Sequence, residues 1–303
     1  MQRIIPHLWF DKEAAEAARF YTSLFPDSET RTPVTLRDTP SGDAQTVSFT
    51  IAGYEFMAIS AGPLFRFNPS VSFMLNFDPS MMEDAEQRLR AAWDSLSEGG
   101  NVLMPLQEYP FSRLFGWTQD RYGVTWQLIL TDPAGEDRPF IIPALLFVGD
   151  ACGHAEDATG LYLDVFDDSR RGSIARYGEG EEPDRAGTVR FTDFMLDGQW
   201  FAAMDSAAAH QFSFNEAISL MVSCESQEEI DWYWERLSAV PEAEQCGWLK
   251  DRYGVSWQIV PTALSRLMEH GTPEQVARVT QAFLKMKKFD IGQLEEAYRS
   301  APA

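Results

Sequence analysis

A ten-residue segment occurs twice in this chain and constrains its fold more than any other feature. The segment 120–129, DRYGVTWQLI, returns 131 residues later as DRYGVSWQIV at 251–260, with seven of ten positions identical. A Gly-Trp pair precedes each copy at the same distance, first as Gly116-Trp117 and then as Gly247-Trp248. A match of this length indicates two copies of one structural unit. The long period indicates duplicated domains and not a solenoid.

Shorter matches extend the repeat over most of the chain. They comprise Ile4–Pro6 with Ile141–Pro143, Thr46–Thr50 with Thr188–Thr192, Phe67-Asn68 with Phe214-Asn215, and two predicted capping boxes that start at Ser80 and Ser226. The repeat spacing shortens near the end, which we attribute to a longer first-half loop over residues 99–114. In a chain of 303 residues, this organisation predicts a domain at 1–134, a second at 139–262 and a helical tail at 263–303.

Hydrophobic periodicity predicts the same order of elements twice within each half. An apolar run at 4–10 indicates a buried strand, and the following segment has apolar residues at helical spacing, with Asp11 as the expected cap. Alternating strands are expected at 47–51 and 54–60, joined by a turn at Ala52-Gly53, with a weaker strand at 29–37. A strand at 71–77, a helix at 80–97, short strands near Val102 and Phe115 and a strand at 125–130 repeat this order. The sequence therefore predicts four βαβββ modules, an α+β fold.

Charge and composition exclude several classes of partner. The net charge of −21 argues against a nucleic acid or an anionic membrane as partner, since both need a basic face. No apolar run reaches spanning length, and the N-terminus lacks the pattern of a signal peptide. Three cysteines, an odd number without C-x-x-C spacing, favour a reducing compartment. We therefore expect a cytoplasmic protein whose partner is a small molecule.

Several sequence motifs resemble those of one protein family. They are Pro6-x-Leu-Trp-Phe-Asp11 with the alanine-rich helix after it, Leu24-Phe-Pro-Asp-Ser28, the segment 246–261 and Met286–Ile291. Together they are similar to the PhnB-like branch of the vicinal oxygen chelate superfamily, the glyoxalase and bleomycin-resistance proteins. This branch is often labelled a 3-demethylubiquinone-9 3-methyltransferase domain. The resemblance implies tandem glyoxalase-like domains whose mixed sheets curl into two cups, followed by the helical tail.

The resemblance also implies a divalent metal in the cup, held by the first strand and by a glutamate on the closing strand. Here Gln127 and Gln258 stand where that glutamate would be, and a neutral amide is a poorer ligand for a divalent cation. His7 on the first strand could be a ligand, but its repeat counterpart is Ala144. We therefore expect no stoichiometric metal. A divalent metal with His7 as a weak candidate ligand is the disfavoured alternative, and the sequence points to no other cofactor.

The expected ligand-binding residues are His7, Trp9, Gln127 and Gln258, all placed in the cups. Strand alternation predicts that Trp126 and Trp257 pack under the helices while the adjacent glutamines face the concave side. The other tryptophans, among them Trp117, Trp200 and Trp248, could line an apolar pocket or fill the cores.

Three functions remain open from the sequence. The first is a small-molecule-binding protein, which could also be an enzyme on a small apolar or oxygenated substrate. The second is a non-enzymatic regulatory or sequestering protein, in which duplication replaces a homodimer of single units. The third is a methyltransferase, which the family label implies. However, Gly178-Glu179-Gly180 lies in an acidic loop with no preceding apolar strand, unlike a methyl-donor or dinucleotide loop. The chain is expected to be a monomer with an internal pseudo-dimer, or a homodimer.

Overall fold

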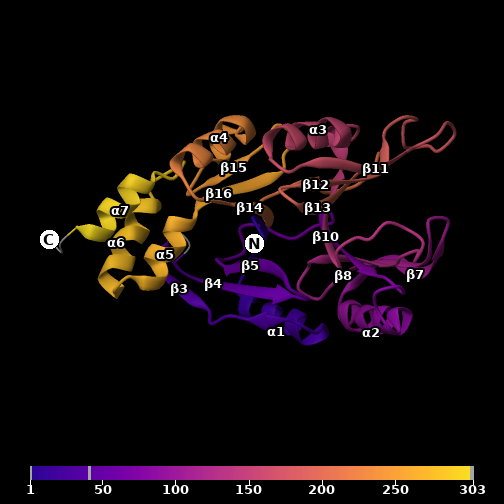
Figure 1. Ribbon diagram of the computed structural model, residues 1–303, viewed down its shortest axis with the longest axis horizontal. Helices are drawn as coiled ribbons and strands as arrows, with labels where there is room; N and C mark the ends of the chain where they lie inside the picture. Colours follow the sequence, from indigo (N-terminus) through magenta and orange to yellow (C-terminus); the bar gives the residue numbers. More distant parts are fainter. Residues whose placement is uncertain (1, 40–41, 301–303) are drawn as a thin grey trace.

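The computed structural model describes residues 2–39 and 42–300, so the first residue and the last three of the predicted tail lie outside the described part. In Figure 1 the N-terminal half lies below and the C-terminal half above, with the helices of the repeats at the outer margins and the strands between them. The tail, in yellow, lies at the left. Within the described residues, no helix is long and apolar enough to cross a membrane.

The first half contains the two predicted modules. The first module consists of β1 (Ile4–Phe10), α1 (Ala14–Leu24), β2 (Glu29–Thr30), β3 (Val34–Thr39), β4 (Gly42–Ile51) and β5 (Tyr54–Ser60). Both β2 and β3 pair with β4, so together they take the place of one strand. The second module consists of β6 (Val71–Phe77), α2 (Ala85–Ser97), β7 (Asn101–Tyr109), β8 (Ser112–Gln119) and β9 (Thr125–Leu130).

The second half repeats this order with one shortened module. Its first module consists of β10 (Ile141–Phe147), α3 (Ala155–Val165), β11 (Arg170–Arg176), β12 (Val189–Leu196) and β13 (Gln199–Asp205). Its second consists of β14 (Ile218–Cys224), α4 (Gln227–Leu237), β15 (Trp248–Lys250) and β16 (Ser256–Pro261). The helices α5 (Thr262–His270), α6 (Pro273–Phe283) and α7 (Ile291–Arg299) form the tail.

The fourth module has two strands after its helix, where the sequence predicted three. The tail occupies the place of the missing edge strand: the backbone N–H groups of Cys246 and Gly247 donate to the carbonyls of Met286 and Lys287 at 2.8 and 2.7 Å. The predicted long loop at 99–114 is also wrong, because those residues form most of the β7–β8 hairpin. The two halves therefore differ in a strand, not in a loop.

Each sheet contains strands from both halves. The first, sheet A, has the order β15-β16-β14-β1-β5-β4-β2, with β3 beside β4. The second, sheet B, has the order β11-β12-β13-β10-β6-β9-β8-β7. The halves join where β1 pairs antiparallel with β14 and where β10 pairs antiparallel with β6. Module one therefore shares a sheet with module four, and module two with module three.

The main hydrophobic core lies on the helix-bearing faces of the two sheets. It includes Leu8, Phe49 and Trp257 from the strands, and Tyr21 from α1 and Ile230 from α4. Trp126 and Trp257 are fully buried there, as strand alternation predicted. The α+β fold of four modules is confirmed, with the shortened fourth module as its one departure.

Strand register corrects one of the repeat matches. Phe49 is opposite Phe56, and Phe194 is opposite Phe201, so the structural counterpart of Phe49 is Phe194. The match of Thr46–Thr50 with Thr188–Thr192 would instead equate Phe49 with Phe191, which packs on the opposite face of its sheet. An odd slip in a strand turns every side chain to the other face. The hairpin turns Ala52-Gly53 and Asp197-Gly198 give the correct alignment, since all four residues have positive φ.

Helix starts were predicted less well. The helix α2 begins at Ala85, because the Ser80 hydroxyl donates to Asp78 instead of capping a helix. Ser226 does cap α4 by accepting from the Glu229 N–H, but the Glu229 side chain accepts from the backbone of Glu225 instead of Ser226. Asp11 does not cap α1 either. The N–H of Ala14 donates to the Ser60 hydroxyl, which comes from β5.

Two repeated asparagines join the halves near the strands they precede. The Asn68 amide donates to the carbonyl of Ser213, and the Asn215 amide donates to the carbonyl of Arg66, both at 2.9 Å. Each side-chain oxygen also accepts from a backbone N–H two residues later, which holds the turn before the strand. The reciprocal contacts show that the halves are related by an approximate twofold arrangement.

Candidate functional site

The candidate site lies on the faces of the two sheets that carry no helices. We call them the A face and the B face, after their sheets. Alternation places Ile5, His7 and Trp9 on the A face, because their neighbours Ile4, Leu8 and Phe10 belong to the helix-side core. By the same rule Ile142, Ala144 and Leu146 lie on the B face. The two faces are pseudo-equivalent and can be compared position by position.

Both faces contain the same glutamine and serine pair. The Gln258 amide donates to the Ser219 hydroxyl at 2.8 Å on the A face, and the Gln127 amide donates to the Ser72 hydroxyl at 2.8 Å on the B face. Trp248 is opposite Gln258 and Trp117 is opposite Gln127. The closing-strand glutamines thus face away from the helices, as predicted, but each is buried and engaged with a serine.

The two faces differ at their centre. His7 is opposite Ser219 on the A face, and Ala144 is opposite Ser72 on the B face. His7 is 4% exposed, and its ring meets Trp248 edge-on with 5.6 Å between centroids. Its Nδ1 has no hydrogen-bond partner among residues 2–39 and 42–300. A buried polar atom without a partner is rare in folded proteins and calls for a physical reason.

Burial keeps the His7 imidazole neutral. Loss of solvation lowers the pKa of His7 to about 4, because the charged form would lose its hydration without gaining an acidic partner. A neutral imidazole has one donor and one acceptor nitrogen. Depending on its tautomer, the unpartnered Nδ1 can therefore donate or accept one hydrogen bond with a neutral group of a bound molecule.

The A face is also the more open of the two. Ile5, Trp9 and Met57 are half-buried, while their B-face counterparts Ile142, Leu146 and Ala202 are at most 6% exposed. The B-face residues form a second hydrophobic cluster that includes Met74, Ala144 and Trp200. No such cluster forms on the A face within the described part of the chain. At these three positions the A face is the more exposed of the two, although the B face also has half-buried side chains at its margins, among them Phe191, Met195 and Met204.

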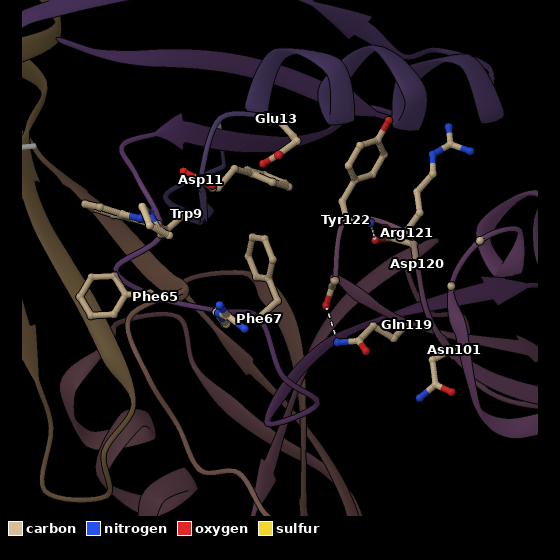
Figure 2. A pocket seen from close by; sticks show the side chains of 16 residues that line it. Trp9, Asp11, Glu13, Phe65, Phe67, Asn101, Gln119, Asp120, Arg121 and Tyr122 are labelled. Atoms are coloured by element: carbon tan, nitrogen blue, oxygen red, sulfur yellow. Dashed lines mark hydrogen bonds between the residues drawn. The ribbon is translucent and has the colours of Figure 1, made fainter. Parts of the chain in front are cut away.

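A pocket of about 570 Å³ adjoins the A face at the end of β1. Figure 2 shows it between Trp9, Phe65 and Phe67 on one side and the turn at Asp120–Tyr122 on the other. The Trp9 ring packs edge-on against Phe65 and Trp248, with 5.2 and 6.1 Å between ring centroids. Its indole N–H donates to the carbonyl of Gly62. Trp9 therefore connects the pocket with the rings that surround His7.

The donor set on the A face does not fit a divalent cation. The candidate ligands are one buried imidazole, a serine hydroxyl and a glutamine amide whose nitrogen is turned to that serine. The described residues contain no group of three histidine, cysteine, aspartate or glutamate side chains that could hold a metal ion. Hard cations favour carboxylate oxygens, and softer ones favour several imidazoles or thiolates. The family's metal is therefore not part of the chemistry we assign to this face.

The aspartate of the repeated DRYGV motif, Asp120 in the first half and Asp251 in the second, has a structural role. Asp120 accepts hydrogen bonds from the Tyr21 hydroxyl, the Trp126 indole and the backbone of Tyr122 and Val124. Asp251 accepts the equivalent four bonds in the second half, from Tyr162, Trp257, Tyr253 and Val255. Burial raises the pKa of Asp120 to about 6, although these hydrogen bonds act in the opposite direction. Burial likewise raises the pKa of Asp251.

The structure groups only part of the predicted site. His7, Trp9 and Gln258 lie on sheet A, whereas Gln127 lies on sheet B with Ala144 in place of the histidine. Sequence reasoning missed Ser72 and Ser219, although both occupy a repeated position two residues before a repeated methionine. It also missed that Trp117 and Trp248 lie beside the glutamines, because the pairing of β8 with β9 and of β15 with β16 was not predicted residue by residue.

Comparison with known proteins places this fold and this repeat in one family. The family model described as 3-demethylubiquinone-9 3-methyltransferase matches residues 2–129 and again 139–260. A PhnB protein from Bacillus cereus is 36% identical over 43% of this chain and all of its own, with a TM-score of 0.38. Glyoxalase I from Zea mays matches 89% of this chain and 97% of its own at 11% identity, with a TM-score of 0.55, which shows a shared fold alone.

A glyoxylase/bleomycin resistance protein/dioxygenase domain from Frankia is 18% identical over 42% of this chain and 94% of its own, with a TM-score of 0.30. No protein among those with curated descriptions matches the chain. The family match covers most of the sequence in two separate segments, each corresponding to one half of the structure. The chain therefore belongs to the PhnB-like 3-demethylubiquinone-9 3-methyltransferase family of the glyoxalase-like superfamily, and carries two copies of its unit.

Proposed function

We propose that this protein binds a small, largely apolar molecule on the A face, and that it does so without a metal ion. The observation that carries the proposal is His7, buried at the centre of the face with Nδ1 unpartnered. The pseudo-equivalent Ala144 shows that the sheet does not need a polar group there. Binding sites typically combine apolar walls with a few converging polar groups, and the A face has this composition.

The surrounding side chains indicate the class of ligand. Trp9 and Trp248 offer aromatic surface, and Met57 and Met221 offer polarizable, adaptable contacts. The neutral His7 supplies one hydrogen bond, while the Gln258 nitrogen is already engaged by Ser219. We therefore expect a neutral aromatic or aliphatic compound with a single hydroxyl, carbonyl or amide group. The adjoining pocket offers space for a larger substituent beside Trp9.

A thermal-shift screen of such compounds, followed by calorimetry, tests the proposal. A ligand at 100 times its Kd stabilises the folded state by about 2.7 kcal/mol, which is readily measured. His7→Phe keeps a ring of similar size and should weaken binding of a hit at least about tenfold, the effect of one lost hydrogen bond to a buried group.

Gln258→Ala and Gln127→Ala form a matched pair for the same experiment. Each removes a buried amide from an equivalent serine contact, but only Gln258 lies on the A face. Binding should weaken in Gln258→Ala and stay unchanged in Gln127→Ala. Equal affinity in all of these variants would place the ligand elsewhere, and so would a requirement for an added divalent ion.

A further inference from the structure

The B face is closed by a charged residue from the linker between the two halves. Arg138, which precedes β10, lies over Trp200 with its guanidinium carbon 3.9 Å from the ring centroid. Its Nε donates to Asp193 at 2.7 Å. The side chains of Arg138 and Asp193 are only 15% and 7% exposed. Trp200 belongs to the B-face cluster with Ile142 and Ala144, so the linker side chain packs on that face.

Asp193 is held in place independently of the arginine. Its Oδ1 accepts from the hydroxyl and backbone N–H of Ser173, leaving Oδ2 for Arg138. Gly172 permits this approach, because a Cβ there would lie 2.2 Å from Asp193 Oδ1 and 2.8 Å from the Trp200 ring. The carboxylate and the indole are thus fixed by strands β11, β12 and β13, while the cation comes from the linker.

Among the described residues, the A face has no comparable pair. By strand register the counterpart of Asp193 is Ser48 and that of Trp200 is Glu55, so neither the carboxylate nor the indole is present. The sheet architecture therefore does not require this combination. An indole face beside a buried carboxylate binds a planar cation through cation–π attraction and charge-assisted hydrogen bonds.

We infer that Asp193 and Trp200 form a guanidinium-binding site on the B face, occupied in cis by Arg138 of the linker. When Arg138 is removed, the site should accept a small planar guanidinium compound from solution. This inference does not depend on the ligand proposed for the A face. It also gives the linker a specific task, namely to cover Trp200 and neutralise Asp193 on one of the two faces.

Arg138→Ala with ethylguanidinium tests the inference, because that ion contains the atoms the substitution removes. We expect the variant to melt at a lower temperature than the parent, and millimolar ethylguanidinium to restore part of the loss. Its apparent Kd should be at least about tenfold lower for the variant than for the parent, where Arg138 competes from within the chain. Ethylammonium, which lacks the planar fork, should restore much less.

Arg170→Ala is the matched control. Its guanidinium carbon lies 4.9 Å from the same ring, but Arg170 has no ion pair within the described residues. No rescue by ethylguanidinium is expected there, nor in the double variant Arg138→Ala, Asp193→Asn. An Arg138→Ala protein that folds only with ethylguanidinium present would support the site most directly. A variant that gains nothing from the ion, folded or not, overturns the inference, as does equal rescue of Arg170→Ala.

Discussion

At the scale of single residues, His7 contributes a pH dependence of known sign. Its pKa is about 4 in the folded protein against 6.5 for an ordinary histidine, so the unfolded chain binds the proton more readily. The stability associated with neutral His7 is therefore complete above pH 6.5 and is lost as the pH falls towards 4. The free energy of unfolding should decrease by roughly 3 kcal/mol from this residue alone between pH 7 and pH 4.

Comparison with His7→Phe isolates that effect. As the pH falls from 7 to 4, the variant should gain roughly the same 3 kcal/mol of unfolding free energy relative to the parent. Asp120 acts in the opposite direction, because a raised carboxyl pKa gives stability that is lost as the pH rises through about 6, but it is common to both proteins. Urea unfolding at several pH values measures the difference.

Some of these residues could be identified from the sequence and others could not. Alternation along a strand is local, so the burial of Trp126 and Trp257 followed from their neighbours. The function of Asp120 was missed although the residue is repeated, because its partner Tyr21 lies 99 positions away. Arg138 was missed for the same reason, since its contacts with Asp193 and Trp200 exist only after two strands of the second half have paired.

At the scale of elements, the sequence predicted most helices and strands, but not what they pair with. The hairpin at Ala52-Gly53 depends on local backbone preferences and was found at the expected position. The start of α2 was wrong by five residues because Ser80 bonds to Asp78. Likewise, the lost strand of the fourth module could not be predicted, because the segment that replaces it comes from the tail.

The docking of the tail should depend on one glycine. At Gly247 an added Cβ would lie 2.4 Å from the Phe289 ring and 2.9 Å from the carbonyl of Ile259, at a φ of +82°. Gly254 has a similar φ of +91°, but its nearest atom would be 3.7 Å away. Gly254→Ala should therefore cost about 1–2 kcal/mol from backbone strain alone. Gly247→Ala should cost at least about 2 kcal/mol more, because Phe289 must move.

Hydrogen exchange and urea unfolding of the two glycine variants measure this difference. Faster exchange in α5–α7 is expected for Gly247→Ala alone, since Gly254 packs near Phe214 and not near the tail. Equal losses of stability in both variants, with the tail protected in each, would show that Phe289 does not anchor the tail.

At the scale of the whole molecule, each half is incomplete without a partner. The β1–β14 and β10–β6 pairings join the halves within both sheets, and Asn68 and Asn215 add reciprocal contacts. Because β6 is the counterpart of β14, the first half contains strands that could pair with those of a second copy of itself.

Expressed alone, residues 1–134 should therefore form a homodimer in which β1 of one copy pairs with β6 of the other. Mixed with residues 139–303 during refolding, they should form a one-to-one complex instead, because that pairing is the native one. Light scattering coupled to size exclusion distinguishes the two assemblies. A first half that stays folded and monomeric at micromolar concentration would show that sheet completion across the halves is not needed for stability.

Placing both copies on one polypeptide also has an evolutionary consequence. In a homodimer both subunits have the same sequence, so every substitution changes both sites at once. A residue that suits a ligand in one site must therefore also be tolerated in the other. When both copies lie on one polypeptide, each site can be substituted independently of the other. Here one centre holds His7 and the other Ala144, and the linker that supplies Arg138 occurs once. Selection can then act on one site for recognition and on the other for rigidity, within a single gene product.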